Sequence, residues 1–307
     1  MIKRIFGVTA LAAGIGLAAG DAGAVEALVP HLAGVNGGGA TGTVLPDGVY
    51  GINTAAYVTG PSFDTAGNKT PTDVEALVEI PEIYWSTGLN ILGAKYAVAI
   101  AEPWDFAGIS GVTSDTGGFA AGAAFATVIS PGILSWDLPN NLHLNARLDV
   151  YIPNGAYRNP INHPFGNGVA IDFFSFEPAV ALTWLSDGWN VSLKAYADIN
   201  TKDQDIDYTS GTVFGTEETI TKGFGKWTFG LQGFTQNQLN NDTGAAVALV
   251  NGPQAALDGH RLTDYGIGPY VGYNFGPVAL ALWTESQFAT VNDTGGLEVF
   301  TKITVPF

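Results

Sequence analysis

The chain has 307 residues, of which 46% are hydrophobic and only 13% are charged, with a formal net charge of −16 and no cysteine. Soluble domains carry roughly 25% charged residues, so this composition fits a soluble protein poorly. The acidic excess argues against nucleic-acid binding, and the lack of cysteine excludes disulfides and a lipid-modified cysteine.

The N-terminus predicts export. Two basic residues precede an apolar run, residues 5–19, and the triplet Ala22-Gly23-Ala24 forms an A-x-A cleavage site. This pattern is typical of a signal peptide, residues 1–24, with a mature chain that begins at Val25. An uncleaved anchor helix is the alternative, but the run is short and rich in Gly and Ala. No later segment has about 18 consecutive apolar residues, which excludes membrane-spanning helices.

Residues 25–47 come next and show little periodicity, with the triplet Gly37-Gly38-Gly39 near their middle. Two interpretations of this segment stay open. It is either a flexible periplasmic lead or a plug that lies inside a barrel lumen. In both cases it precedes the first predicted strand, which begins at residue 48.

Hydrophobic and polar residues alternate along the rest of the chain. Across residues 142–152, for example, the even positions are apolar and the odd positions are mainly polar. An alternation with period two predicts β-strands. Twelve strands are predicted, at residues 48–58, 74–86, 94–103, 118–136, 141–152, 173–185, 189–199, 211–223, 227–237, 264–275, 278–287 and 296–307.

The links between the predicted strands alternate in length. The short links are residues 87–93, 138–140, 186–188, 224–226 and 276–277, and the long ones are 59–73, 104–117, 153–172, 200–210, 238–263 and 288–295. Short periplasmic turns and long extracellular loops are typical of outer-membrane barrels. We therefore predict an all-β fold, a transmembrane antiparallel β-barrel over residues 48–307, in the bacterial outer membrane.

Alternation alone would also suit a soluble sandwich, whose sheets bury their apolar faces against each other. The placement of aromatic residues favours the barrel, because they lie on the apolar face at strand ends, as in a membrane-interface girdle. These residues are Trp184, Trp189, Tyr273, Phe275 and Phe307.

Three predicted strands have special features. Residues 211–223 carry Thr and Glu on both faces, so this strand is expected either to shift in register or to lie partly above the membrane. Residues 118–136 are too long for one span and are expected either to project outward or to bend at Pro131-Gly132. The last strand ends on Phe307, which resembles the signal that the barrel-insertion machinery recognises. That machinery, outer-membrane lipid and lipopolysaccharide are therefore the expected partners.

An outward-facing apolar side turns the polar side of each strand toward a lumen, where ionisable groups are candidates for function. Seven acids and three bases are predicted there together with one histidine, so pairing between neighbouring strands cannot satisfy every acid. Two interpretations stay open: structural pairs that hold the wall in register, or an acidic, water-accessible path. The candidates are Glu75, Glu79, His143, Arg147, Asp149, Glu177, Lys194, Asp198, Glu285, Glu298 and Lys302.

The sequence predicts neither an enzyme nor a bound cofactor. Its four histidines are His31, His143, His163 and His260, and no motif pairs one of them with a nucleophile. The spacing of Asp203, Asp205 and Asp207 resembles the start of a calcium loop, but position six is Tyr208 and position twelve is Phe214. The EF-hand pattern therefore fails, no metal site is predicted, and loose divalent-cation binding by an acidic external loop stays open.

Several short runs occur in a specific order along the chain: residues 74–85 leading into ILGAKY (91–96), LDVYIPNGAY (148–157), FEPAVALTW (176–184), DYTSG (207–211), GPYVGYNF (268–275) and VPF (305–307). Together they resemble the outer-membrane family named for the meta-pathway of phenol degradation, which includes sphingosine-induced outer-membrane proteins. The resemblance covers about residues 45–307, and this chain departs from the pattern at residues 211–223. It implies a membrane barrel that transports small hydrophobic molecules.

Two functional hypotheses follow. The first is a channel for passive uptake of small hydrophobic or aromatic compounds, with Tyr157, Phe165 and Phe173 as candidates for ligand capture in one loop region. The second is a non-transporting receptor, adhesin or envelope scaffold that acts through its loops. Solute flux in liposomes separates the two.

Overall fold

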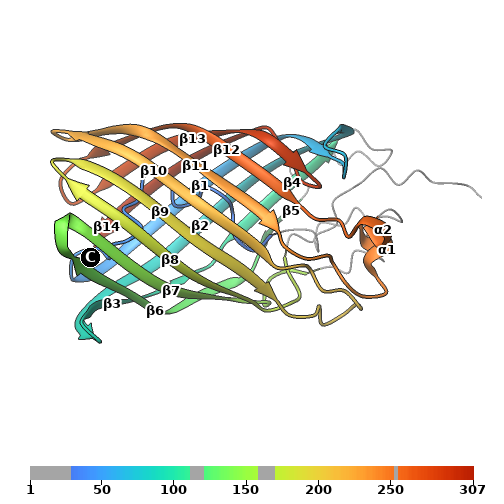
Figure 1. The fold of residues 1–307 in the computed structure, drawn as a ribbon, viewed down its shortest axis with the longest axis horizontal. Coiled ribbons are helices and arrows are strands. Elements are labelled where there is room, and N and C mark those ends of the chain that lie inside the picture. Colours follow the sequence, from blue (N-terminus) through green and yellow to red (C-terminus); the bar gives the residue numbers. More distant parts are fainter. Residues whose placement is uncertain (1–28, 111–120, 158–169, 252–254) are drawn as a thin grey trace, which may run out of the picture.

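The computed structural model describes residues 29–110, 121–157, 170–251 and 255–307. The chain forms one antiparallel sheet that closes on itself as an elongated barrel (Figure 1). The strands are β1 (Gly48–Phe63), β2 (Lys69–Ile91), β3 (Ala94–Ala101), β4 (Trp104–Ser110), β5 (Ala121–Ala124), β6 (Thr127–Leu138), β7 (Leu142–Ile152), β8 (Ser175–Ser186), β9 (Trp189–Asn200), β10 (Val213–Phe224), β11 (Trp227–Gln238), β12 (Thr263–Asn274), β13 (Ala279–Val291) and β14 (Leu297–Pro306).

The closed sheet has twelve wall positions. Strand β1 pairs with both β2 and β14, which closes the barrel. Strand β4 continues the course of β3 beyond Pro103, and β5 leads into β6 beside it. Proline has no N–H to donate, so Pro103 interrupts the ladder and divides one wall strand into two segments. The twelve-strand prediction is therefore confirmed.

The wall is extended beyond the prediction near its N-terminal strands. Strand β2 spans 23 residues, and its first half pairs with β4, in a region predicted as a loop. The register of β6 shifts between Ile129 and Gly132, so the expected bend at Pro131 is present as a β-bulge. Strand β10 pairs without a register shift with both β9 and β11. The Thr and Glu residues that left its register open lie on a regular strand.

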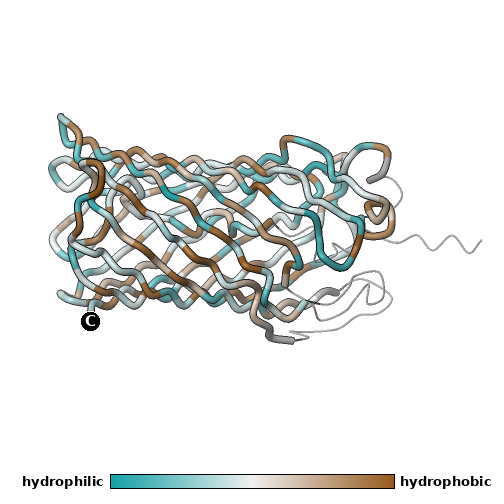
Figure 2. The backbone as a smooth tube through the Cα atoms, turned by 90° about the horizontal axis from the view of Figure 1, so that it is seen from below, coloured by the Kyte–Doolittle hydropathy of each residue, from teal (hydrophilic) through white to brown (hydrophobic). Residues whose placement is uncertain are grey.

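Hydrophobic and hydrophilic positions alternate along the strands (Figure 2). The exposed large hydrophobic side chains place the apolar face of the wall on the outer surface. Leu182 and Leu193, for example, are 45% and 48% exposed, whereas Thr183 and Lys194 next to them are buried. At the end with the short turns, aromatic rings contact one another in a girdle, as expected at a membrane interface. Its members include Phe224, Trp227, Phe229, Tyr273 and Phe275.

The opposite end of the barrel carries the long links (Figure 1). Two short helices, α1 (Val247–Val250) and α2 (Ala255–Asp258), lie in the link between β11 and β12 and were not predicted. A 3-10 turn, η2 (Pro139–Asn141), joins β6 to β7 at the short-turn end. Within the described ranges, no helix is long and apolar enough to cross a membrane.

Residues 29–47 run through the inside of the barrel and bond to its inner wall. Gly42 N donates to Thr183 Oγ1 at 2.7 Å, and the Trp283 indole donates to the carbonyl oxygen of Gly34 at 3.1 Å. The glycine triplet suits this close approach. A Cβ atom built at Gly37 would lie 1.5 Å from the Gln232 side chain, and Gly38 has a φ of +69°. Both positions therefore need glycine.

Candidate functional site

A histidine of the N-terminal segment lies between two acidic side chains of the wall. His31 Nδ1 is 3.0 Å from Glu177 on β8, and its Nε2 is 3.2 Å from Glu217 on β10. All three side chains are buried. A neutral imidazole has only one N–H, so it can donate to both carboxylates only as the imidazolium. The geometry therefore favours a charged His31.

Further bonds surround this contact. Lys194 Nζ donates to Glu177 at 3.0 Å, and the Tyr151 hydroxyl donates to the same carboxylate at 2.9 Å. Asn36 of the N-terminal segment donates to Glu217 at 2.6 Å. Two cations, His31 and Lys194, thus face two carboxylates, Glu177 and Glu217, through buried hydrogen bonds. We call His31, Glu177, Lys194 and Glu217 the latch.

The surroundings of His31 also set its ionisation. Burial and Lys194 lower the pKa of this histidine, but the carboxylates of Glu177 and Glu217 outweigh them and raise it to about 9. The ring of Tyr196 lies 4.0 Å from the imidazole ring, and Asp198 is buried nearby on the same strand. His31 is therefore mostly protonated near neutral pH.

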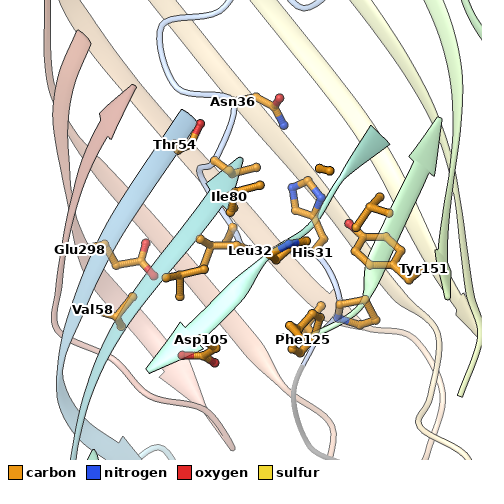
Figure 3. A pocket seen from close by; sticks show the side chains of 18 of the residues that line it. His31, Leu32, Asn36, Thr54, Val58, Ile80, Asp105, Phe125, Tyr151 and Glu298 are labelled. Carbon is orange, nitrogen blue, oxygen red and sulfur yellow. The ribbon is translucent and has the colours of Figure 1, made fainter. Parts of the chain in front are cut away.

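The other side of the N-terminal segment borders a cavity of about 290 Å³, here called the apolar cavity. Leu32 of the segment and Val58 and Ile80 of the wall project into it, and Asp105 and Phe125 lie at its lower end in the view of Figure 3. The aliphatic part of its wall comes from the N-terminal segment and from the inner faces of β1, β2, β3 and β6. The aliphatic lining comprises Val29, Leu32, Ala33, Val35, Val58, Val74, Ala76, Val78, Ile80, Ala99, Ala101 and Val128.

Charged groups also line the cavity. Arg147 donates through Nε to Asp149 at 2.7 Å and through a terminal nitrogen to Ser130 at 2.9 Å. Lys302 Nζ donates to the carbonyl oxygen of Val35 at 3.0 Å. Glu82 on β2 interacts electrostatically with both bases but forms no hydrogen bond to the described residues. Two acids and two bases are thus balanced on this part of the wall. Other acids, Asp105, Asp264, Asp293 and Glu298, line the cavity elsewhere.

A pair of acids lies on the adjacent strands. Glu285 on β13 and Glu298 on β14 are direct neighbours in the sheet, and both are buried. Gln232 donates to Glu285 Oε1 at 2.6 Å, which satisfies part of this pair. Asp293, between β13 and β14, also lines the cavity, and burial raises its pKa to about 6.

The inner wall carries nine of the eleven predicted lumen residues. Glu75 and Glu79 are the exceptions, and the structure places them on the outer face instead. The β2 residues that line the cavity are the even-numbered ones from 74 to 82, so the odd-numbered acids point outward. Glu79 there accepts a hydrogen bond from Asn53. The inward residues are His143, Arg147, Asp149, Glu177, Lys194, Asp198, Glu285, Glu298 and Lys302.

The loop candidates for ligand capture separate in the structure. Phe173 is fully buried and packs with Phe125, Tyr151 and Ile171, so it holds the loop base together instead of facing a ligand. Tyr157 is half-buried. Phe165 lies outside the described residues.

The acidic loop after β9 forms a turn. Asp203 Oδ1 accepts hydrogen bonds from the backbone N–H groups of Asp205 and Ile206, both at 2.7 Å, and Asp207 pairs with Lys202 at 2.7 Å. These bonds explain the spacing of the three aspartates as local capping. The part of the chain that the structure describes holds no group of three or more His, Asp or Glu side chains arranged for a metal ion.

Sequence reasoning missed four residues of the site: His31, Glu82, Asp105 and Glu217. His31 lies 146 residues from Glu177 and 186 from Glu217, so no local pattern could connect them. One signal was present. Strand β10 has an unusually polar face for a membrane strand, and Glu217 on that face binds the N-terminal segment.

The closed wall, the apolar outer face and the partly filled interior define an outer-membrane β-barrel fold. A crystallised outer membrane channel from Pseudomonas putida F1 has a TM-score of 0.72 and 13% identity, over 86% of this chain and 97% of that one. The family model described as "Putative MetA-pathway of phenol degradation" matches residues 54–303, so the chain belongs to that family. The predicted resemblance and the outer-membrane location are thus confirmed.

Two autotransporter domains are also similar to the chain. The β domain of Bordetella BrkA has a TM-score of 0.47 and 12% identity, over 85% of this chain and all of that one. The translocator domain of NalP from Neisseria meningitidis has a TM-score of 0.48 and 12% identity, over 86% of this chain and 90% of that one. Among curated proteins, none matches the chain.

Proposed function

We propose that this channel admits small hydrophobic or aromatic compounds by passive diffusion. The apolar cavity is the observation that carries the proposal. An apolar solute gains free energy on the Val, Ala, Ile and Leu side chains that form one part of the cavity wall. The description of the family, which refers to phenol degradation, supports the same class of solute.

Residues 29–47 are proposed to act as a plug that narrows the lumen. Their hydrogen bonds to β8, β10, β13 and β14 hold them across the interior. Cleavage after Ala24, as the signal-peptide pattern predicts, would leave a short lead before Val29. A solute would then pass along the apolar side of the plug, because the latch closes the other side.

The C-terminal strand is proposed to be the signal for membrane insertion. Phe307 is 83% exposed, and its backbone N–H donates to Val49 at 2.9 Å across the β1–β14 seam. Its ring is therefore available to a partner, and its backbone helps to close the barrel. Outer-membrane lipid and lipopolysaccharide are the proposed surroundings of the apolar outer face. We propose no catalytic role for the chain.

Flux into liposomes tests the proposed function. The purified full-length protein should accelerate equilibration of a small aromatic probe above the rate of protein-free liposomes. The protein should accelerate the equilibration of a hydrophilic sugar of similar size much less. If neither aromatic flux nor ion conductance is measurable, the protein is not a channel for these solutes, and a receptor or scaffold that acts through its loops becomes the better account.

A further inference from the structure

One carboxyl group of the apolar cavity stands apart from the ionic pairs around it. Asp105, on β4, lines the cavity, and its Oδ1 atom is buried without a hydrogen-bond partner among the described residues. Buried polar atoms without partners are rare and costly, because they lose their bonds to water without replacement. Such an atom beside an apolar cavity indicates a missing partner.

The other charged groups of the cavity do not supply that partner. Asp105 pairs in the sheet with Val78, whereas Glu82 lies four residues further along β2. The two bases that interact with Glu82, Arg147 and Lys302, lie on β7 and β14. Four residues of a strand span about 13 Å. The cavity lining also includes Val78, Phe125 and Ala101 (Figure 3 labels Phe125). Glu298 lines the cavity as well, with an Oε2 atom that has no hydrogen-bond partner among the described residues, but it is an acid and lies beside Glu285 in the sheet.

We propose that Asp105 binds the polar group of the solute, and that the solutes admitted best are small apolar molecules that carry a hydroxyl group. This inference rests on the proposed function and specifies its substrate class. An apolar cavity of about 150 Å³ can hold benzene. The larger cavity here therefore has room for a substituted ring whose apolar body contacts Val58, Val74 and Val78.

A hydroxyl group suits Asp105 better than other polar groups do. An ionised carboxylate only accepts hydrogen bonds, and a protonated carboxyl group can also donate one. An amine pairs well only with the first form, and an ether oxygen only with the second. A hydroxyl both donates and accepts, so it pairs with Asp105 in either state. A plain hydrocarbon of the same shape leaves Oδ1 unpaired.

Two fluorinated probes of nearly equal shape test the proposal. In 4-fluorophenol a hydroxyl occupies the place of the methyl group of 4-fluorotoluene, and fluorine NMR reports the binding of each to the full-length protein in detergent. Asp105→Leu should weaken binding of 4-fluorophenol roughly tenfold, the effect of one hydrogen bond, and leave 4-fluorotoluene nearly unchanged. Asp105→Asn keeps a donor and an acceptor and should lose no more than about threefold.

Glu75→Gln is the matched control, because it neutralises an acid on the outer face of the same wall, and it should change neither affinity. Equal losses for both probes in Asp105→Leu, or no loss for 4-fluorophenol, would overturn the proposal. If Asp105→Leu does not fold, the affinities of the wild-type protein for the two probes test the proposal. Binding of 4-fluorotoluene as tight as that of 4-fluorophenol overturns the inference, as does the absence of binding by either probe.

These outcomes are distinct from failure of the proposed function. A channel that accelerates aromatic flux in liposomes but does not discriminate between the two probes keeps its proposed function and loses the hydroxyl preference. A protein without flux loses the proposed function, whatever Asp105 binds.

Discussion

The two sides of the N-terminal segment meet the barrel wall in opposite ways. Toward β8, β9 and β10 it meets charged side chains, and the His31 contacts are buried and fully bonded. Toward β1, β2 and β3 it meets mainly aliphatic side chains and leaves a cavity of about 290 Å³, which His31 and Lys194 of the latch border from the other side. The same segment is thus anchored on one side and leaves space on the other.

This difference shows how one short segment can serve two purposes. A buried charge is tolerated only when its partners are complete, so the latch holds the segment in one position. Apolar contacts are less directional, so the opposite side can leave a gap without breaking any bond. We infer that anchoring and solute binding are divided between the two sides of the lumen. The predictions below test that division.

Removal of His31 should have the largest effect. His31→Ala leaves Glu177 and Glu217 with Lys194 as the nearest cation, and loss of one partner from a buried ionic group costs about 3–5 kcal/mol. The docked state of residues 29–47 would then lose roughly 10²–10³-fold in population. We expect a clear rise in single-channel conductance in planar bilayers.

His143→Ala is the control for this experiment. His143 also faces inward, but its ring bonds to Asp137 at 2.8 Å and not to the N-terminal segment. Conductance of this variant should stay at the wild-type level. An unchanged conductance in His31→Ala, with the barrel still resistant to unfolding in cold SDS, would show that the latch does not hold the segment.

High pH should weaken the same contact more mildly. The pKa of His31 in the docked state, about 9, is above the usual value near 6.5, so protonation favours docking. That stabilisation is complete below about pH 6.5 and is lost as pH rises through about 9. The titratable groups that face the ring are Glu177, Lys194, Asp198 and Glu217.

Conductance of the wild type should therefore increase between pH 8 and pH 10, and less than in His31→Ala, because a neutral imidazole still donates one hydrogen bond. His31→Ala should lack this pH dependence. A rise of equal size in both proteins would assign the effect to another group.

The fold could be predicted from the sequence because its physical basis is local and repeated. Alternation with period two, aromatic strand ends and unequal links all follow from a wall with lipid on one side. The division of β3 from β4 at Pro103 could not be predicted, because the continuation of β4 depends on pairing with the extended β2. Strand β10 was doubtful for a related reason: its polar inner face is explained only by the segment that docks on it.

The site was less predictable. The inner and outer faces of β2 both carry apolar residues, such as Val78 inside and Ile83 outside, so alternation alone could not show which face is buried. The prediction that Glu75 and Glu79 face the lumen was wrong for this reason. The latch depends on contacts between distant parts of the chain, which no pattern within one strand encodes.

Filling the apolar cavity should affect solutes and leave the latch intact. Ala76→Phe places a ring in the cavity, whereas Leu77→Phe adds a similar ring on the outer face of the same strand. Overpacking costs typically about 1–3 kcal/mol, so uptake of an aromatic probe into liposomes should fall roughly tenfold or more in Ala76→Phe. Leu77→Phe should retain wild-type uptake. Equal uptake by the two variants would show that solutes do not use this cavity.

Ion preference should show the smallest effect, and it depends on which acids face the lumen. Glu82 lines the cavity with Arg147, Asp149 and Lys302, and Asp149 pairs with Arg147, so Glu82→Gln leaves one base, Lys302, in excess there. One charge about 8 Å from a permeating ion contributes about 0.5 kcal/mol in water, which is roughly a twofold change in the permeability ratio. The reversal potential in a salt gradient should therefore shift modestly toward anions.

Glu79→Gln removes the same charge from the same strand on the outer face, three residues away, where Asn53 already donates to that carboxylate. We expect no shift in its reversal potential, because the barrel wall separates this group from the lumen. Each substitution should be measured alone and also in combination with His31→Ala. The larger current expected from His31→Ala makes a small shift in the reversal potential easier to resolve. If the reversal potential shifts as much in Glu79→Gln as in Glu82→Gln, the inner and outer faces of β2 are assigned wrongly. Val74, Ala76 and Val78 would then not line the apolar cavity.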